Sequence, residues 1–77
     1  MLKEHERVVL TTDIPGDGLQ AGDVGTIVHV YPRGEAFEIE FLTLGGDTAA
    51  VTTVTSSQVR PVSKRDITHA RDMELSA

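Results

Sequence analysis

Three aspartates, Asp13, Asp17 and Asp23, lie within one glycine-rich stretch, residues 13–25. Carboxylates gathered in this way can hold a calcium ion, but their spacing is not the D-x-D-x-D-G of an EF-hand loop. Aspartates in turns also accept hydrogen bonds from their own backbone. In addition, a row of carboxylates can form an acidic rim for a basic partner. The turn-forming role is the simplest of the three interpretations, the partner rim comes second, and the metal site comes last.

The histidines give no metal-binding pattern. They stand in the N-terminal segment, in the middle of the chain and near its end, as His5, His29 and His69. A zinc or transition-metal site needs three or four converging ligands, and neither H-x-H nor H-E-x-x-H spacing occurs. We therefore expect solvent-facing histidines and no metal ion.

Catalytic patterns are equally absent. The glycines at 16, 18, 22 and 25 lack the Lys-Ser/Thr pair or the following helix of a phosphate-binding loop. Glu38 and Glu40 share one face of an expected strand, which general acid–base chemistry would need, but an exposed polar face gives the same spacing. None of the serines stands in a G-x-S-x-G elbow. We expect neither catalysis nor a cofactor.

Size and charge narrow the functional classes. The chain has 77 residues, no cysteine, and 12 acidic against 7 basic residues, for a net charge of −5. Residues 63–77 hold equal numbers of acidic and basic side chains, so residues 1–62 carry the excess. A surface of this sign repels nucleic-acid phosphates. The charged N-terminus lacks the apolar core of a signal peptide, and no run is apolar enough to span a bilayer, so we expect a cytoplasmic protein without a membrane partner.

The elements that must position these residues are short strands. Strands are expected over 7–11, 24–31, 36–41, 49–54 and 59–62, where β-branched and aromatic residues are frequent. Residues 36–41 alternate most cleanly, with Phe37, Ile39 and Phe41 on the inner face. The apolar positions of 24–31 fit neither face of a period of two, which predicts a bulge near residues 26–28. Leu19 is expected to anchor the long loop onto the core.

These elements predict an all-β fold, a small five-stranded SH3-like barrel over residues 1–62. A 3₁₀ turn is expected at 55–58, and Pro61 places the last strand at a sheet edge. Residues 63–77 form a separate C-terminal tail. Ser63 and Asp66 resemble a capping box, and Ile67, Ala70 and Met73 follow at a spacing of three. This spacing allows a short helix, which would be marginal on its own.

Several motifs carry a family resemblance. Leu19-x-x-Gly22-Asp23-x-Gly25-Thr26-Ile27-Val28-x-Val30 is similar to the signature of SH3-like and KOW-type modules. With V-V-L-T-x-D-I-P, E-A-F-E-I-E-F and Q-V-R-P-V, it resembles the bacterial domain of unknown function 4926, over about residues 3–62. The resemblance implies a small protein, and for some members an antitoxin- or immunity-like role beside a neighbouring toxin.

The expected function is a non-enzymatic protein-interaction module with a partner that is preferably basic. Tyr and Arg are enriched at binding hot spots, and Tyr31 and Arg33 flank one turn, although Tyr31 can equally cap the core. The partner-binding candidates are Asp13, Asp17, Asp23, Tyr31, Arg33, Ile67 and Met73. A KOW-like nucleic-acid or ribonucleoprotein binder is one alternative, disfavoured by the acidic surface. A homo-oligomeric structural protein is another.

Overall fold

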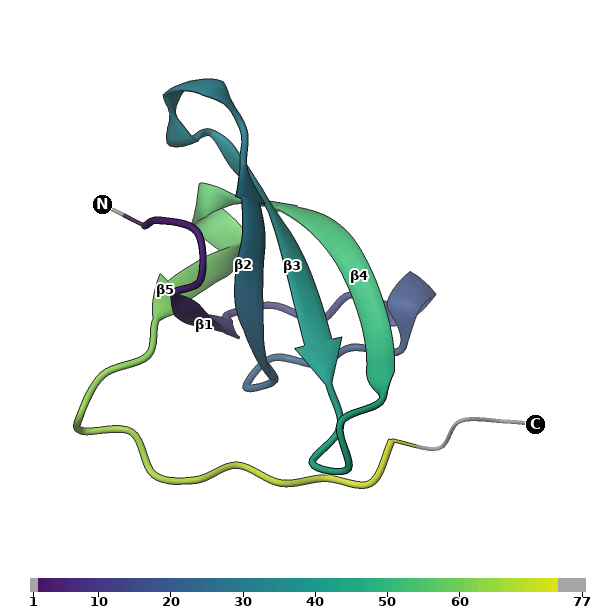
Figure 1. The fold of residues 1–77 in the computed structure, drawn as a ribbon. Helices are drawn as coiled ribbons and strands as arrows, with labels where there is room; N and C mark the ends of the chain where they lie inside the picture. Colours follow the sequence, from purple (N-terminus) through teal and green to yellow (C-terminus); the bar gives the residue numbers. More distant parts are fainter. Residues whose placement is uncertain (1, 74–77) are drawn as a thin grey trace.

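One antiparallel sheet makes up the fold (Figure 1). The computed structural model describes residues 2–73. Along the sheet the strand order is β4-β3-β2-β1-β5. The strands are β1 (Arg7–Leu10), β2 (Val24–Val30), β3 (Ala36–Leu42), β4 (Thr48–Thr55) and β5 (Val59–Pro61). The 3₁₀ turns are η1 (Pro15–Asp17), η2 (Pro32–Gly34) and η3 (Ser56–Gln58). The expectation of an all-β protein is confirmed.

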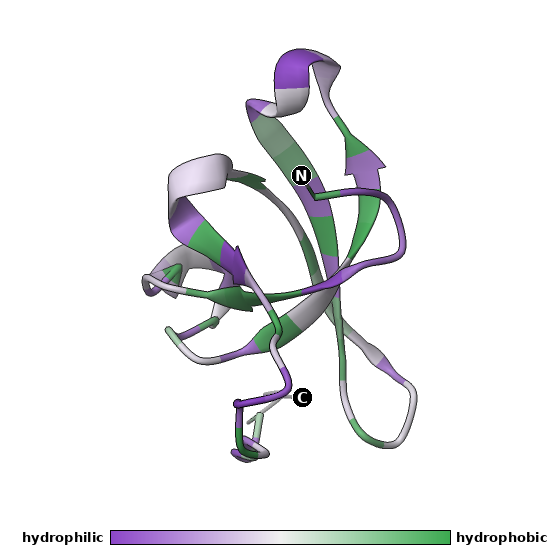
Figure 2. Cartoon of the chain, turned by 90° about the vertical axis from the view of Figure 1, so that its left-hand side faces the viewer, coloured by the Kyte–Doolittle hydropathy of each residue, from purple (hydrophilic) through white to green (hydrophobic). Residues whose placement is uncertain are grey.

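The core lies on one face of this sheet, called the inner face here. The alternation predicted for β3 is confirmed, since Phe37, Ile39 and Phe41 are all buried. In Figure 2 hydrophobic and hydrophilic segments follow one another along the strands, as an alternating pattern requires. The buried cluster also includes residues of every other strand and of the first loop, namely Val8, Leu10, Leu19, Ile27, Val54 and Val59. Leu19 thus anchors the loop, as expected.

Strand β2 bends where the sequence predicts it. Its pairing with β3 shifts register between Ile27 and His29, which leaves Val28 in a bulge. Gly25, two residues before Ile27, faces the core at very close range. A Cβ atom there would lie 2.8 and 2.9 Å from ring carbons of Phe41 and closer still to Ile39. The strand can cross the core at this distance only because residue 25 has no side chain.

The sheet ends agree with the sequence in part. Pro61 lies in β5 at one end of the strand order, and η3 precedes that strand, both as expected. Thr55 and Gln58 also form a capping box at η3. Among residues 2–73 no ladder joins β4 to β5. The sheet is therefore open, and closure into a barrel stays a prediction. No helix in the described part of the chain is both long and apolar enough to cross a membrane.

The expectation of a helical tail is wrong for the described residues. One half of the expected capping box forms, with the Ser63 N–H donating to Asp66 Oδ2 at 2.7 Å, but Ser63 Oγ accepts from the Arg65 N–H and not from Asp66. These bonds close a single turn, and residues 67–73 then run without a helix. A single helical turn is unfavourable by itself, because it fixes the backbone of several residues for only one hydrogen bond. In place of a helix, the tail holds alternate side chains against the β1–β2 loop. Residues 74–77 of the expected tail lie outside the described residues.

Candidate functional site

The loop between β1 and β2 holds Asp23 in a fixed position. Asp13 Oδ1 accepts a hydrogen bond from the Ala21 N–H at 2.8 Å, which closes the loop upon itself. The Leu10 N–H donates to the backbone oxygen of Asp23 at 2.9 Å. The Gln20 N–H donates to Asp23 Oδ2, also at 2.9 Å. These loop contacts hold the carboxylate at the entrance to β2, and with the tail in place Asp23 is only 8% exposed.

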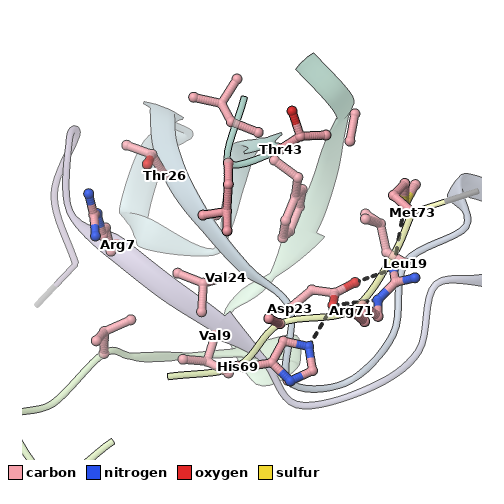
Figure 3. A pocket seen from close by; sticks show the side chains of 18 of the residues that line it. Arg7, Val9, Leu19, Asp23, Val24, Thr26, Thr43, His69, Arg71 and Met73 are labelled. Carbon is pink, nitrogen blue, oxygen red and sulfur yellow. Dashed lines mark hydrogen bonds and ion pairs between the residues drawn. The ribbon is translucent and has the colours of Figure 1, made fainter. Parts of the chain in front are cut away.

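The tail supplies the cations that neutralise this carboxylate (Figure 3). Arg71 Nε donates to Asp23 Oδ1 at 2.8 Å and Arg71 Nη2 to Oδ2 at 2.6 Å. Nη2 also donates to the backbone oxygen of Gly18 at 2.8 Å. His69 Nε2 lies 3.1 Å from Asp23 Oδ1. We call Asp23, His69 and Arg71 the Asp23 cluster. A two-pronged guanidinium–carboxylate pair of this kind is directional as well as strong.

Two glycines provide the surface on which the tail lies. Gly18 and Gly22 both have positive φ, +70° and +99°, a backbone conformation that residues with a side chain rarely adopt. A Cβ atom at residue 22 would lie 3.5 Å from the His69 ring, and one at residue 18 would lie 3.4 Å from Met73 Cε. Met73 also packs against the core cluster. His69, Arg71 and Met73 therefore contact the loop from alternate positions of an extended segment.

The charge state of Asp23 depends on these contacts. Burial by itself raises the pKa of Asp23, but hydrogen bonds from Arg71, the Gln20 N–H and His69 outweigh burial and hold it below its ordinary value of 3.8. With four N–H groups directed at its two oxygens, the carboxylate acts here as an anchor for cations.

A groove adjoins the cluster on the outer face of the sheet, opposite the core. It has a volume of about 1040 Å³ and lies between β1, β2, β3, the β3–β4 turn and the tail. Apolar side chains line it although they are exposed, including Val24, Leu42, Leu44 and Val62. Asp23, His69, Arg71 and Met73 line the same cavity. The outer groove and the Asp23 cluster are thus one continuous surface.

The structure separates the candidate residues predicted from the sequence. Asp23 lies in the cluster, and Met73 lies nearby against Gly18 and the core. Asp13 stabilises the loop, and Asp17 is exposed in η1. Tyr31 precedes η2 and Arg33 lies within it, in the β2–β3 turn, which is drawn far from the tail in Figure 1. The Tyr31 ring packs edge-on against His29 with a centroid distance of 4.6 Å, and Arg33 is exposed. Ile67 is 92% exposed and lines the outer groove.

The carboxylate pair Glu38 and Glu40, considered above for acid–base chemistry, makes structural hydrogen bonds. Glu38 accepts a hydrogen bond from the Thr53 hydroxyl at 2.7 Å, and Glu40 accepts one from the Thr48 hydroxyl at 2.9 Å. Both carboxylates thus join β3 to β4 across the outer face. Among residues 2–73, no group of three or more His, Cys, Asp or Glu side chains is arranged to hold a metal ion.

Comparison with protein families gives one match. The model of a domain of unknown function (DUF4926) matches residues 4–61. The chain belongs to the DUF4926 family. No curated protein and no solved structure matches it. The DUF4926 match includes the glycine-rich loop and Asp23 but ends before the tail. His69, Arg71 and Met73 therefore lie outside the matched residues.

The sequence reasoning missed His69 and Arg71 as binding residues. The signal that could have found them is the spacing of two between His69, Arg71 and Met73, which places them on one side of an extended segment. The spacing of three in the same segment picks out Ile67, Ala70 and Met73, of which Ile67 and Ala70 are exposed and only Met73 packs against the core.

The lowered pKa of Asp23 predicts how tail docking responds to acid. The contribution of the ionised carboxylate is complete above pH 3.8, its ordinary value, and is lost as the pH falls through the lower value of the folded state. We expect the Gly18 and Gly22 amide NMR signals to move below pH 3.8 towards their positions in an Asp23→Asn variant. The same titration of that variant is the control and should lack this transition. If the wild-type Gly18 and Gly22 signals already coincide with those of Asp23→Asn at pH 7, Asp23 does not hold the tail.

Proposed function

We propose that this DUF4926 chain is a non-enzymatic protein-interaction module that binds a segment of a basic partner protein in the outer groove. The observation that carries the proposal is the groove itself, which leaves Val24, Leu42 and Leu44 exposed beside a fixed carboxylate. Contiguous exposed apolar side chains rimmed by charges are typical of protein-binding surfaces. The net charge of −5 favours a basic partner because complementary charge accelerates association.

The finer architecture that we propose is an SH3-like barrel. Three features support it: the strand order β4-β3-β2-β1-β5, the bulge in β2 and the η3 turn directly before β5. A strongly bent sheet of this order brings β4 and β5 towards each other through η3, and bulges are the usual device for such bending. The long β1–β2 loop then lies at one end of the barrel beside the outer groove.

The biological setting that we propose is the bacterial cytoplasm, where the partner is the product of a neighbouring gene and the chain acts in an antitoxin- or immunity-like manner. The acidic charge suits a partner with a basic active surface, which the module would mask. Co-expression with the neighbouring gene product tests this narrower form. A stoichiometric complex supports it, and separate elution of the two proteins contradicts it.

Two valines of β2 provide a matched pair for testing the groove. Val24 and Val28 are each 41% exposed, but Val24 lines the groove and Val28 does not. Lysine at residue 24 would place a positive charge against a basic partner. We expect Val24→Lys to weaken partner binding by about tenfold or more, as a like charge introduced at an interface does, and Val28→Lys to leave it unchanged.

Native purification followed by size-exclusion chromatography measures the effect. The proposal predicts one basic protein that co-purifies stoichiometrically with the wild-type chain and with Val28→Lys, and is reduced with Val24→Lys. Recovery of RNA in its place would favour a KOW-like nucleic-acid binder. A homodimer without a second protein would favour the oligomeric alternative. Equal loss in both variants would show that the groove is not the binding surface.

A further inference from the structure

The Asp23 cluster has the geometry of an occupied peptide-binding site, with the tail as its occupant. We propose that Asp23 and the Gly18 carbonyl form a binding site for an arginine side chain of the partner's segment, and that Arg71 of the tail fills this site when the partner is absent. The inference rests on the proposed function, because it names the chemistry that the partner presents at one end of the outer groove.

The contacts of Arg71 specify a guanidinium group. Its Nε and Nη2 each bond a different oxygen of Asp23, at 2.8 and 2.6 Å, while Nη2 also reaches the Gly18 oxygen at 2.8 Å. A planar fork satisfies this arrangement of three acceptors, whereas a lysine ammonium is a point charge on a flexible stem and cannot pair with both carboxylate oxygens in the same way. The site therefore selects arginine over lysine.

The residues on either side of Arg71 specify an extended segment. His69 lies against Gly22 and Met73 lies against Gly18, two positions before and after the arginine. Both loop glycines have positive φ and present bare backbone to the tail, so the loop surface accommodates side chains at a spacing of two. A matching partner segment presents a flat ring, an arginine and an unbranched apolar side chain at alternate positions.

Side-chain contacts hold the tail in place. Among residues 2–73, no backbone hydrogen bond joins 67–73 to the rest of the chain. Residues 67–70 and Asp72 are exposed. A second segment with the same side chains can therefore make the same contacts without adding a strand to the sheet.

The turn at residues 63–66, where the tail begins, makes the chain its own competitor. Arg60 bonds both oxygens of Asp66, at 3.0 and 2.8 Å, and this pair directs the chain back across the outer groove. A tethered occupant competes at an effective concentration in the millimolar range. A partner segment must therefore displace the tail, and once it does so it can continue into the outer groove, which shares residues with the site.

A peptide titration tests the inference. The full-length Arg71→Ala chain, labelled with ¹⁵N, is titrated with a synthetic peptide of residues 67–73, Ile-Thr-His-Ala-Arg-Asp-Met. We expect saturable shifts of the Gly18, Gly22 and Asp23 amide signals. Binding to the wild-type chain should be weaker by roughly tenfold or more because its own tail competes. A peptide carrying the Arg71→Lys change, and an Asp23→Asn chain in the Arg71→Ala background, should each reduce binding by a similar factor.

Three results would overturn the inference: no saturable shifts at millimolar peptide, equal binding by the lysine peptide, or equal binding by the Asp23→Asn chain. If Arg71→Ala does not fold, as judged from the β-strand amide signals, Arg71→Lys replaces it as the acceptor chain. The test is separable from that of the proposed function. If the peptide binds but Val24→Lys does not weaken partner binding, the arginine site is supported and the groove is excluded as the partner-binding surface. If Val24→Lys weakens partner binding but the peptide does not bind, only the arginine site is excluded.

Discussion

Replacing Gly25 by alanine should lower the free energy of unfolding by about 3 kcal/mol, as overpacking of a tightly filled core does. Gly25 faces the core at a point where an added methyl group would overlap Ile39 and approach two Phe41 ring carbons to 2.8 and 2.9 Å. Ile39 and Phe41 are 0% and 3% exposed, so neither can move aside into solvent. Either β2 must withdraw from β3 or the ring must leave its preferred rotamer.

The expected loss is large for a chain of this size. A domain of 77 residues has a total stability of roughly 4–12 kcal/mol. A loss of 3 kcal/mol should lower the melting temperature by about 12–24 °C. Gly16→Ala is the matched control, since Gly16 has open space around it and should tolerate the same methyl group. Thermal unfolding followed by circular dichroism compares the two, and equal melting temperatures would contradict the packing described for β2.

The second large effect is expected at Asp23. Asp23→Ala removes the acceptor of the Gln20 N–H and the partner of Arg71 and His69. We expect the free energy of unfolding to fall by about 2 kcal/mol, the usual cost of orphaned donors to a charged group. The loss stays below the 3–5 kcal/mol typical of a broken buried pair because the tail can carry Arg71 into water.

Asp17 offers the control for this change. It lies in the same loop, its side chain is exposed, and its replacement by alanine alters the net charge of the chain equally. Asp17→Ala should change the free energy of unfolding by no more than about 0.5 kcal/mol. Urea unfolding monitored by circular dichroism measures both variants. Equal destabilisation would show that the general loss of negative charge matters and that the Asp23 cluster does not.

The sequence predicts the sheet well because its signals are local. The alternation of Phe37, Ile39 and Phe41 fixes which face of β3 is buried, and the irregular pattern around Ile27 and Val28 indicates the bulge. Proline and glycine mark the turns for the same reason, because each restricts or frees the backbone at one position. These signals do not report whether the two end strands meet, so barrel closure stays a prediction.

The candidate site is less predictable because its contacts are distant in sequence. Asp23 and Arg71 are 48 positions apart, and nothing in the residues around either one identifies the other. The tail also contains two competing patterns. The Ser63–Asp66 capping box and the spacing of Ile67 and Met73 indicate a helix, whereas the gain from docking His69, Arg71 and Met73 stabilises an extended chain. Tertiary contacts decide between them.

The docking of the tail on the glycine-rich loop is the claim on which the binding site depends, and proton–proton distances in the wild-type chain test it most directly. At pH 7, nuclear Overhauser spectra should show contacts between the Met73 methyl group and the Gly18 α-protons, and between the His69 ring and the Gly22 α-protons. Random-coil chemical shifts over residues 67–73, with neither contact detected, would contradict the account.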